Sequence, residues 1–125
     1  MKQGKPVFLI VDNFLSAEQE ETIKNDLVER GAVVFWSHDL SEAKYDWRQN
    51  CTEIDLVVWG DDYWSDEDWE EAPKFFYKQL GCPMSKMMAA CVVSDVKEAQ
   101  SQYCYYYSEY DIGEDCFSEY VMNLF

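Results

Sequence analysis

Short runs of consecutive apolar residues alternate with longer amphipathic segments along this chain. The runs over 6–11, 32–36, 54–59 and 87–93 contain almost no polar side chains. Such runs are typical of strands that are buried on both faces of a parallel sheet. A fifth strand is expected over 103–107, where four tyrosines give strand propensity.

Helix signals lie between these runs. Ser16 followed by Gln19 has the spacing of a capping box, and Gly31 fits the position just after a helix end. A helix is therefore expected from Ser16 to Arg30. Further helices are expected over 41–50, from Ser65 onward, over 74–80 with Pro73 as its first residue, over 96–102 and over 115–124.

This alternation of strands and helices predicts an α/β fold. Each strand is followed by a helix, which favours a doubly wound five-stranded parallel sheet with helices on both faces, a three-layer sandwich. No repeat, low-complexity tract or linker divides the sequence. We therefore expect a single domain over residues 1–125.

The chain is strongly acidic, with 25 Asp and Glu against 10 Lys and Arg and a formal net charge of −15. Direct binding to nucleic acid or to anionic membranes needs a basic face, so both are excluded as expectations. A protein partner with a basic surface fits the charge. The start has no signal-peptide pattern, and the apolar runs are too short to span a bilayer, so we expect a cytoplasmic protein.

Cysteine and histidine give no sign of a structural metal. The five cysteines include no CxxC pair, and the single histidine, His38, has no metal-binding neighbour that we identify at helical spacing. We expect reduced, mostly buried thiols and a structural His38. Cys82, before Pro83, is expected to be a buried loop thiol, because no basic neighbour is identified that would lower its pKa.

The order and content of these segments resemble a response-regulator receiver domain of the chemotaxis-regulator kind, which has a flavodoxin-like fold. The resemblance covers nearly the whole chain. It is carried by Phe8-Leu-Ile-Val-Asp-Asn13, by Asp55-Leu-Val-Val-Trp59, by Val92-Val-Ser94 and by Tyr105-Tyr-Tyr-Ser108. These segments match the first strand with its paired acids, the phosphoacceptor strand, the fourth strand and the fifth strand.

The resemblance implies a site of acids that hold Mg²⁺, with a phosphoacceptor Asp at the end of the third strand. Asp12 retains one acid, and Asn13 replaces the second. Gly60 occupies the phosphoacceptor position in the direct register. Asp61 or Asp62 fits only if the strand ends one or two residues later. The candidate Mg²⁺ ligands are therefore Asp12, Asp61 and Asp62, and the alternative, that these acids only cap helices or face water, stays open.

Two further positions of the family site are a switch hydroxyl and a lysine. Ser94 fits the hydroxyl, but the lysine position falls near Ser108 or Glu109. Neither side chain neutralises the charge that develops on a transferring phosphoryl group. The resemblance thus implies a degenerate receiver, for which we expect no enzymatic activity and no cofactor, with Mg²⁺ left open.

The segment over 61–71, called here the acidic-aromatic segment, is the strongest candidate for protein binding. Seven carboxylates alternate with aromatic rings that are enriched at interface hot spots. A solvated helix start is the simpler interpretation of such a charge run. The predicted binding residues are Asp61, Asp62, Tyr63, Trp64, Asp66, Glu67, Asp68, Trp69, Glu70 and Glu71.

Three functional hypotheses follow. The first is a non-enzymatic receiver-like regulatory domain that works in signal transduction by protein–protein contact. The second is a small acidic inhibitor of a basic nucleic-acid-binding protein, of the immunity-protein or DNA-mimic anti-restriction or anti-CRISPR type. The third is a phosphoacceptor receiver that uses Asp61 with Mg²⁺. The sequence contains none of the GxGxxG, GxxxxGK[ST], GxSxG and HExxH motifs.

Overall fold

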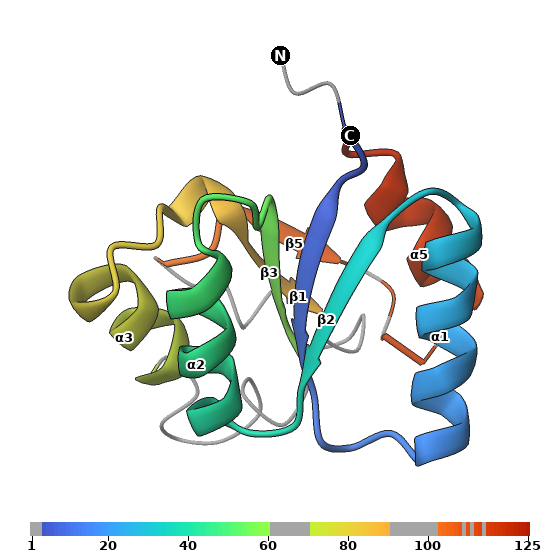
Figure 1. Ribbon diagram of the computed structural model, residues 1–125, viewed down its shortest axis with the longest axis horizontal. Coiled ribbons are helices and arrows are strands. Elements are labelled where there is room, and N and C mark those ends of the chain that lie inside the picture. The colour runs from blue at the N-terminus through green and yellow to red at the C-terminus, as the bar shows by residue number, and fades with distance from the viewer. Residues whose placement is uncertain (1–3, 61–70, 91–102, 109, 111, 114) are drawn as a thin grey trace.

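A computed structural model describes residues 4–60, 71–90, 103–108, 110, 112–113 and 115–125, and strands alternate with helices in it (Figure 1). The predicted helices from Ser65 and over 96–102 lie outside these residues. The strands are β1 (Val7–Val11), β2 (Val33–Ser37), β3 (Leu56–Trp59), β4 (Met87–Ala90) and β5 (Tyr106–Ser108). The helices are α1 (Ala17–Glu29), α2 (Leu40–Asn50), α3 (Glu71–Gln79) and α5 (Asp115–Met122), with a 3₁₀ turn over Met84–Lys86.

The strands form one sheet in the order β2-β1-β3-β4-β5, and all pairs are parallel. The predicted α/β fold with a parallel sheet is confirmed. The chain leaves β1 for the edge at β2 and returns to β3 on the other side of β1. This reversal makes the carboxyl ends of β1 and β3 the switch point, where ligand sites of open α/β sheets usually lie.

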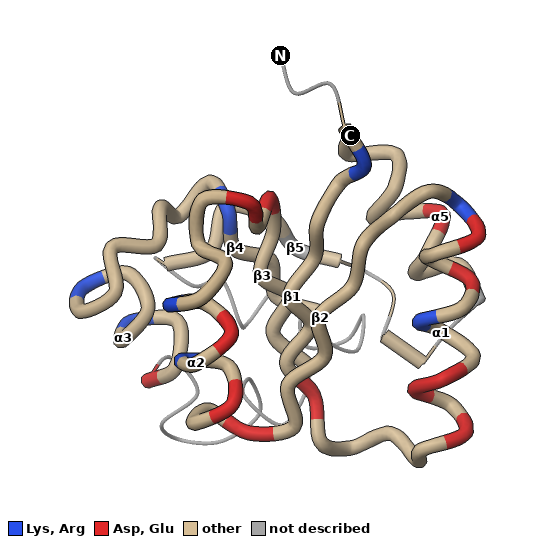
Figure 2. The backbone as a smooth tube through the Cα atoms, viewed as in Figure 1, with Lys and Arg blue, Asp and Glu red and all other residues tan. Residues whose placement is uncertain are grey.

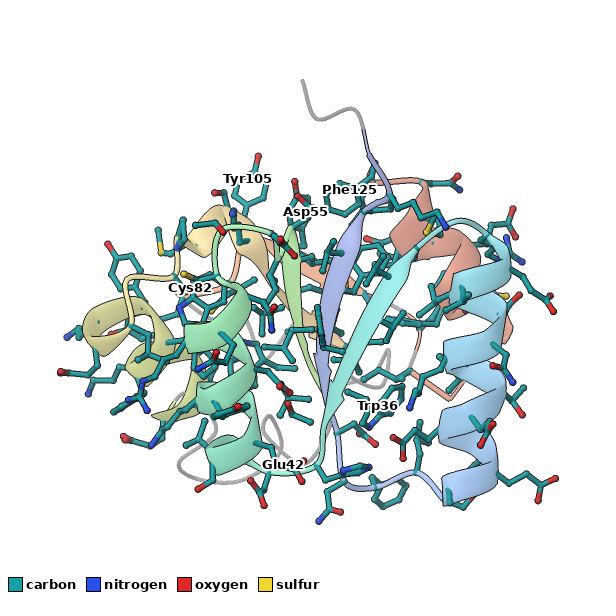
Figure 3. The ribbon with its side chains drawn as sticks, in the orientation of Figure 1. Trp36, Glu42, Asp55, Cys82, Tyr105 and Phe125 are labelled. Atoms are coloured by element: carbon teal, nitrogen blue, oxygen red, sulfur yellow. The ribbon has the colours of Figure 1, made fainter. Side chains whose placement is uncertain are left out.

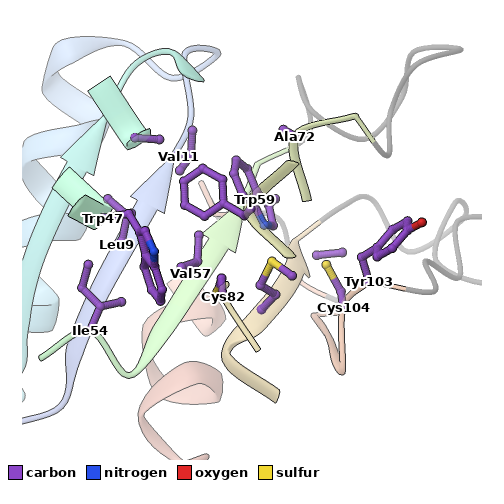
Figure 4. Packing of buried hydrophobic residues seen from close by; sticks show 14 of the residues in the cluster. Leu9, Val11, Trp47, Ile54, Val57, Trp59, Ala72, Cys82, Tyr103 and Cys104 are labelled. Carbon is purple, nitrogen blue, oxygen red and sulfur yellow. The ribbon is translucent and has the colours of Figure 1, made fainter. Parts of the chain in front are cut away.

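Helices cover both faces of the sheet (Figure 1), with α1 and α5 on one face and α2 and α3 on the other. Successive strand residues point to opposite faces, so each apolar run supplies two cores. Leu9, Val57 and Trp59 belong to the core under α2 and α3 (Figure 4). Phe8, Ile10 and the α5 residue Phe117 belong to the other. No helix in the described ranges is long and apolar enough to cross a membrane.

The predicted start and end of α1 are confirmed. The Ser16 hydroxyl accepts the Gln19 N–H at 3.2 Å, and the Gln19 side chain accepts the Ser16 N–H at 3.0 Å, which completes the capping box. Gly31 follows the helix with a φ of +99°, a conformation that favours glycine. Local sequence therefore sets both ends of this helix.

The prediction for α3 was wrong in its start. The helix begins at Glu71, so Pro73 lies within its first turn and is not its first residue. The backbone N–H groups of a first turn have no partner inside the helix, and a proline there removes no helical hydrogen bond. Pro73 is buried and does not interrupt the helix.

Two strand predictions also need correction. The sequence predicted a second strand buried on both faces, but β2 is the edge strand, and only its last residue, Ser37, is buried. The fifth strand was expected over 103–107 and comprises Tyr106–Ser108. Tyr103 and Cys104 precede it and are both buried, so they do not alternate as strand residues would.

The described cysteines carry free thiols, of which Cys82 and Cys104 are buried, Cys51 is half-buried and Cys116 is exposed. The prediction of mostly buried thiols is thus wrong for Cys116. Burial raises the pKa of the Cys82 thiol to about 12, and the positive charge of Lys86 opposes this shift. Lys86 stands four residues after Cys82, so the prediction that Cys82 has no basic neighbour was wrong. Cys82 is therefore uncharged at neutral pH and a poor nucleophile.

We expect iodoacetamide at pH 8 to modify Cys116 in the native protein while Cys82 stays unmodified. The thiolate is the reacting form, and Cys82 combines a raised pKa with complete burial. Peptide mapping after a short pulse measures each site separately. The same pulse in denaturant is the control and should modify both. Equal rates in the native protein would contradict this assignment.

Candidate functional site

Asp12 follows β1 directly and lies at the switch point of the sheet, where only 3% of its surface is exposed. Its Oδ2 accepts the N–H groups of Phe14 and Leu15, both at 3.0 Å. Its carbonyl oxygen accepts the Trp36 indole N–H at 3.2 Å. The carboxylate thus fixes the turn that leads from β1 into α1.

Gly60 lies beside Asp12 at the end of β3. Its N–H donates to the carbonyl of Val11 at 2.8 Å. A Cβ atom at this position would overlap Asp12 Oδ1 and would lie 3.0 Å from both Asp12 Cβ and the Val11 carbonyl oxygen. Because one of these neighbours is backbone, the site accepts glycine and has no space for a longer side chain.

A second polar pair closes the end of β2. The hydroxyl of Ser37, which is fully buried, donates to Asp46 Oδ2 on α2 at 2.7 Å. A hollow of about 480 Å³ opens next to this pair and is lined by Trp36, His38, Ser41, Glu42, Tyr45 and Asp46. Trp36 and Glu42 both lie at this lower edge in Figure 3, opposite Asp55, Tyr105 and Phe125.

His38 joins α1 to α2 at the same edge. Its Nε2 lies 2.8 Å from Glu20 Oε2, and its Nδ1 lies 3.3 Å from Glu42 Oε2. The hydrogen bond to Glu20 raises the pKa of His38 above its ordinary value of 6.5; burial opposes this shift and Glu42 adds to it. Glu42 stands four residues after His38, so the prediction of no ligand-type neighbour at helical spacing was wrong. The structural role predicted for His38 agrees with these contacts.

The His38 contacts are expected to make stability depend on pH. A folded pKa above the unfolded value means that the stabilisation is complete below pH 6.5 and is lost as the pH rises through the folded pKa. The effect is small because the His38 side chain is 48% exposed. Urea unfolding across this window should show the decline in the wild type and not in His38→Gln.

A direct measurement supports the same test. His38 is the only histidine, so its ring proton resonances are unambiguous in an NMR titration. We expect its pKa to lie above 6.5 and to fall in Glu20→Gln, with Glu29→Gln as the matched control elsewhere on α1. A pKa at or below 6.5 would show that the Glu20 contact is not formed in solution.

The predicted Mg²⁺ ligands are only partly described, since Asp61 and Asp62 lie outside the described residues. Asp12 is at the predicted place, but its Oδ2 already accepts two backbone N–H groups. Among the residues that the structure describes, no group of three His, Cys, Asp or Glu side chains is arranged to hold a metal ion. The Mg²⁺ site of Asp12, Asp61 and Asp62 therefore stays a prediction.

Of the residues at the switch and lysine positions of the family site, the structure describes Ser108. Ser94, the predicted switch hydroxyl, and Glu109 lie outside the described residues. Ser108 ends β5 and is buried, and its hydroxyl donates to the Tyr110 carbonyl at 2.7 Å and accepts the Tyr110 N–H at 3.1 Å. Ser108, one of the two residues near the lysine position that the resemblance implies, thus closes a local turn.

The acidic-aromatic segment lies outside the described residues except for its last residue. Glu71 is exposed at the first position of α3. The segment connects Gly60 with α3, and α3 packs on the sheet through Ala72 and Phe76. The residues that flank the segment in the chain, Gly60 and Ala72, are both buried.

Comparisons with known proteins agree with this architecture. The crystal structure of a response regulator from Thermotoga maritima matches with a TM-score of 0.67 and 21% identity, over 96% of this chain and 97% of that chain. The Francisella novicida lysine decarboxylase matches with a TM-score of 0.56 and 19% identity, over 98% of this chain and 17% of that chain. No protein-family model and no curated protein matches the sequence.

The likeness to the response regulator confirms the resemblance at the level of the fold, so the chain has a receiver-like fold. Within this fold, sequence reasoning placed Asp12 correctly. It missed the contacts of His38 with Glu20 and Glu42, and the buried Ser37–Asp46 pair. The spacing of four residues between His38 and Glu42 was the available signal.

Proposed function

We propose that this chain is a non-enzymatic receiver-like regulatory domain that acts in the cytoplasm by contact with a protein partner. The observation that carries the proposal is the packing of Asp12 against Gly60. Receivers react at a side chain in the place of Gly60, and here that place has neither a nucleophile nor the space for one. The receiver fold is kept while its reacting position is closed.

Phosphoryl transfer to a carboxylate also requires positive charge near the transferred group. Of the two residues near the lysine position of the family, Ser108 is engaged with Tyr110, and Glu109 is acidic. Three acidic residues add negative charge at the edge of the sheet where the strands end (Figure 2). They lie in the first turns of α1 and α2 and are Glu18, Glu20 and Glu42. These features support a role in binding over a role in phosphoryl transfer.

The acidic-aromatic segment is our proposed contact surface. It carries seven carboxylates and no basic residue, together with Tyr63, Trp64 and Trp69. Aromatic residues supply binding energy at interfaces, and the carboxylates favour a partner with a basic surface. The segment directly follows Gly60 in the chain, and Gly60 lies beside Asp12 at the switch point.

Treatment with acetyl phosphate and Mg²⁺ tests the absence of phosphoacceptor chemistry. We expect intact-mass spectrometry to show no phosphoryl adduct on the wild-type chain. An adduct that disappears in Asp61→Asn would overturn the proposal and support a phosphoacceptor receiver with Mg²⁺. Asp26→Asn, a change of the same kind on α1, is the matched control.

Substitution of the aromatic residues tests the contact surface. Affinity capture from cells that contain the protein should lose its specific partner in Trp64→Ala/Trp69→Ala and should keep it in Tyr45→Ala. Tyr45 is a good control because it is an aromatic residue on α2 with 63% exposure. Retention of the partner in the double variant would contradict the assignment of this surface.

The distribution of charge favours a second candidate, an acidic inhibitor of a nucleic-acid-binding protein. Residues 51–125 contain 16 acidic and 4 basic residues, a net charge of −12. Such an inhibitor would associate quickly with a basic groove, and its association rate would fall steeply with salt. Capture of a nuclease that is lost at high salt would favour this candidate, while salt-resistant capture of a signalling protein favours the first.

A further inference from the structure

The edge strand β2 combines three features that the proposed function does not use. Among the described residues, it pairs only with β1. Its residues are apolar up to Ser37, and Val33 is 38% exposed. In Figure 1 it is the strand nearest to the viewer, and no described segment passes in front of it.

The register of β2 shows which backbone groups face outward. Val33 N–H donates to Pro6, and the Ser37 carbonyl accepts the Asp12 N–H, so Val33, Phe35 and Ser37 direct their backbone groups toward β1. The N–H and C=O groups of Val34 and Trp36 therefore point away from the sheet. Within the described chain, no hydrogen bond is found for these four groups.

The chain closes the outward edge on both sides of these two residues. Ala32 N–H donates to the Leu27 carbonyl at 3.0 Å, and His38 N–H donates to Glu42 Oε2 at 2.7 Å. The open part of the edge is thus limited to Val34–Trp36. Edge strands usually carry a charge, a proline or a bulge that prevents pairing, and residues 31–37 contain no charged residue and no proline.

We propose that β2 pairs with β2 of a second copy of this chain, antiparallel and centred on Phe35. In this register, Val34 of one copy exchanges both backbone hydrogen bonds with Trp36 of the other, and the reverse pair does the same. All four outward groups of each copy are then satisfied. Only an antiparallel pairing lets two identical edges do this about a twofold axis.

The side chains of β2 fit a second copy in the same register. Phe35 lies opposite Phe35, and Val34 lies opposite Trp36, so apolar side chains meet across the axis. At each end of the paired strands, Arg30 of one copy comes near Asp39 of the other copy, and these two side chains have opposite charges. The net charge of −15 on each copy opposes association as a whole, so salt should strengthen it.

Sedimentation equilibrium tests the dimer. For a chain of 14.8 kDa, we expect the average mass to rise toward twice this value with protein concentration, and to rise further at high salt. Val34→Pro should weaken association by about tenfold or more, because each proline removes an outward N–H donor that β1 does not use. Val34→Thr keeps the N–H and should associate as the wild type does.

Disulfide cross-linking tests the register in a background with Cys51, Cys91 and Cys116 replaced by serine. Phe35→Cys should form a disulfide-linked dimer, because facing residues in such a pair have Cα atoms about 4.5 Å apart. Val33→Cys should not, because the two copies of residue 33 are offset by four residues, about 14 Å. Circular dichroism checks that both variants are folded.

The outcomes separate clearly. A protein that stays monomeric at every protein and salt concentration would overturn the proposal, and the β2 edge would then be open to a strand of another protein. Association that persists in Val34→Pro would also overturn it. Equal cross-linking at residues 33 and 35 would overturn the register. None of these results depends on the acidic-aromatic segment, so the proposed function can fail without affecting this inference.

Discussion

Phe76→Ala is expected to lower the free energy of unfolding by about 3–5 kcal/mol, as removal of a fully buried phenylalanine does. The Phe76 ring has no exposed surface. Its centroid lies 4.8 Å from that of Trp59 in an edge-to-face contact and 6.0 Å from that of Trp47. Truncation removes both aromatic contacts and leaves a cavity between α3 and the sheet.

Chemical denaturation followed by circular dichroism measures this loss. Phe14→Ala is the matched control, because the same side chain is 70% exposed there and its loss should change stability by less than about 0.5 kcal/mol. A loss below about 1 kcal/mol in Phe76→Ala would mean that α3 is not packed as described. Phe76 lies on α3, which follows the acidic-aromatic segment in the chain, so on the proposed function its variant should weaken partner capture as well.

Sequence predicted best those elements whose signals are local. The capping box at Ser16 and Gln19 and the glycine at 31 define α1 without reference to the rest of the chain. The buried strands β1, β3 and β4 were also predicted, since a continuous apolar run needs cover on both faces. Together these elements determine the layer architecture.

Predictions that depend on spatial neighbours were less accurate. The run over 32–36 looks like a buried strand, but burial depends on the order of strands in the sheet, which places β2 at the edge. Pro73 was taken as the start of a helix, although the first turn accepts proline at more than one position. Both differences arise from context that hydrophobic pattern does not contain.

The site shows the same division. Asp12 was predicted from its place after a strand, and its burial agrees with that position. The bridge from His38 to Glu20 spans 18 residues, so it depends on where α1 lies relative to the loop after β2, and no local pattern predicts it. The closeness of Asp12 to Gly60 depends in the same way on the pairing of β1 with β3.

Gly60→Asp introduces an acidic residue where the receiver resemblance places the phosphoacceptor in the direct register, and we expect it to destabilise the protein without creating a phosphoacceptor. A new Cβ would overlap Asp12 Oδ1 and crowd the Val11 carbonyl oxygen. Overpacking of this kind costs about 1–3 kcal/mol, and a second carboxylate beside the buried Asp12 adds repulsion. Acetyl phosphate with Mg²⁺ should therefore give no adduct at residue 60.

Two controls isolate the cause. Gly4→Asp adds the same side chain where no atom lies within 4 Å of a new Cβ, and should leave stability unchanged within about 0.5 kcal/mol. Gly60→Ala should be less harmful in an Asp12→Ala background than alone, since part of the collision is removed. If Gly60→Asp is instead as stable as the wild type and accepts a phosphoryl group, the site is an intact receiver centre that lacks one residue. The expected result means that Asp12 and Gly60 are fitted to each other, so that recovery of the chemistry would require the whole switch point to be rebuilt.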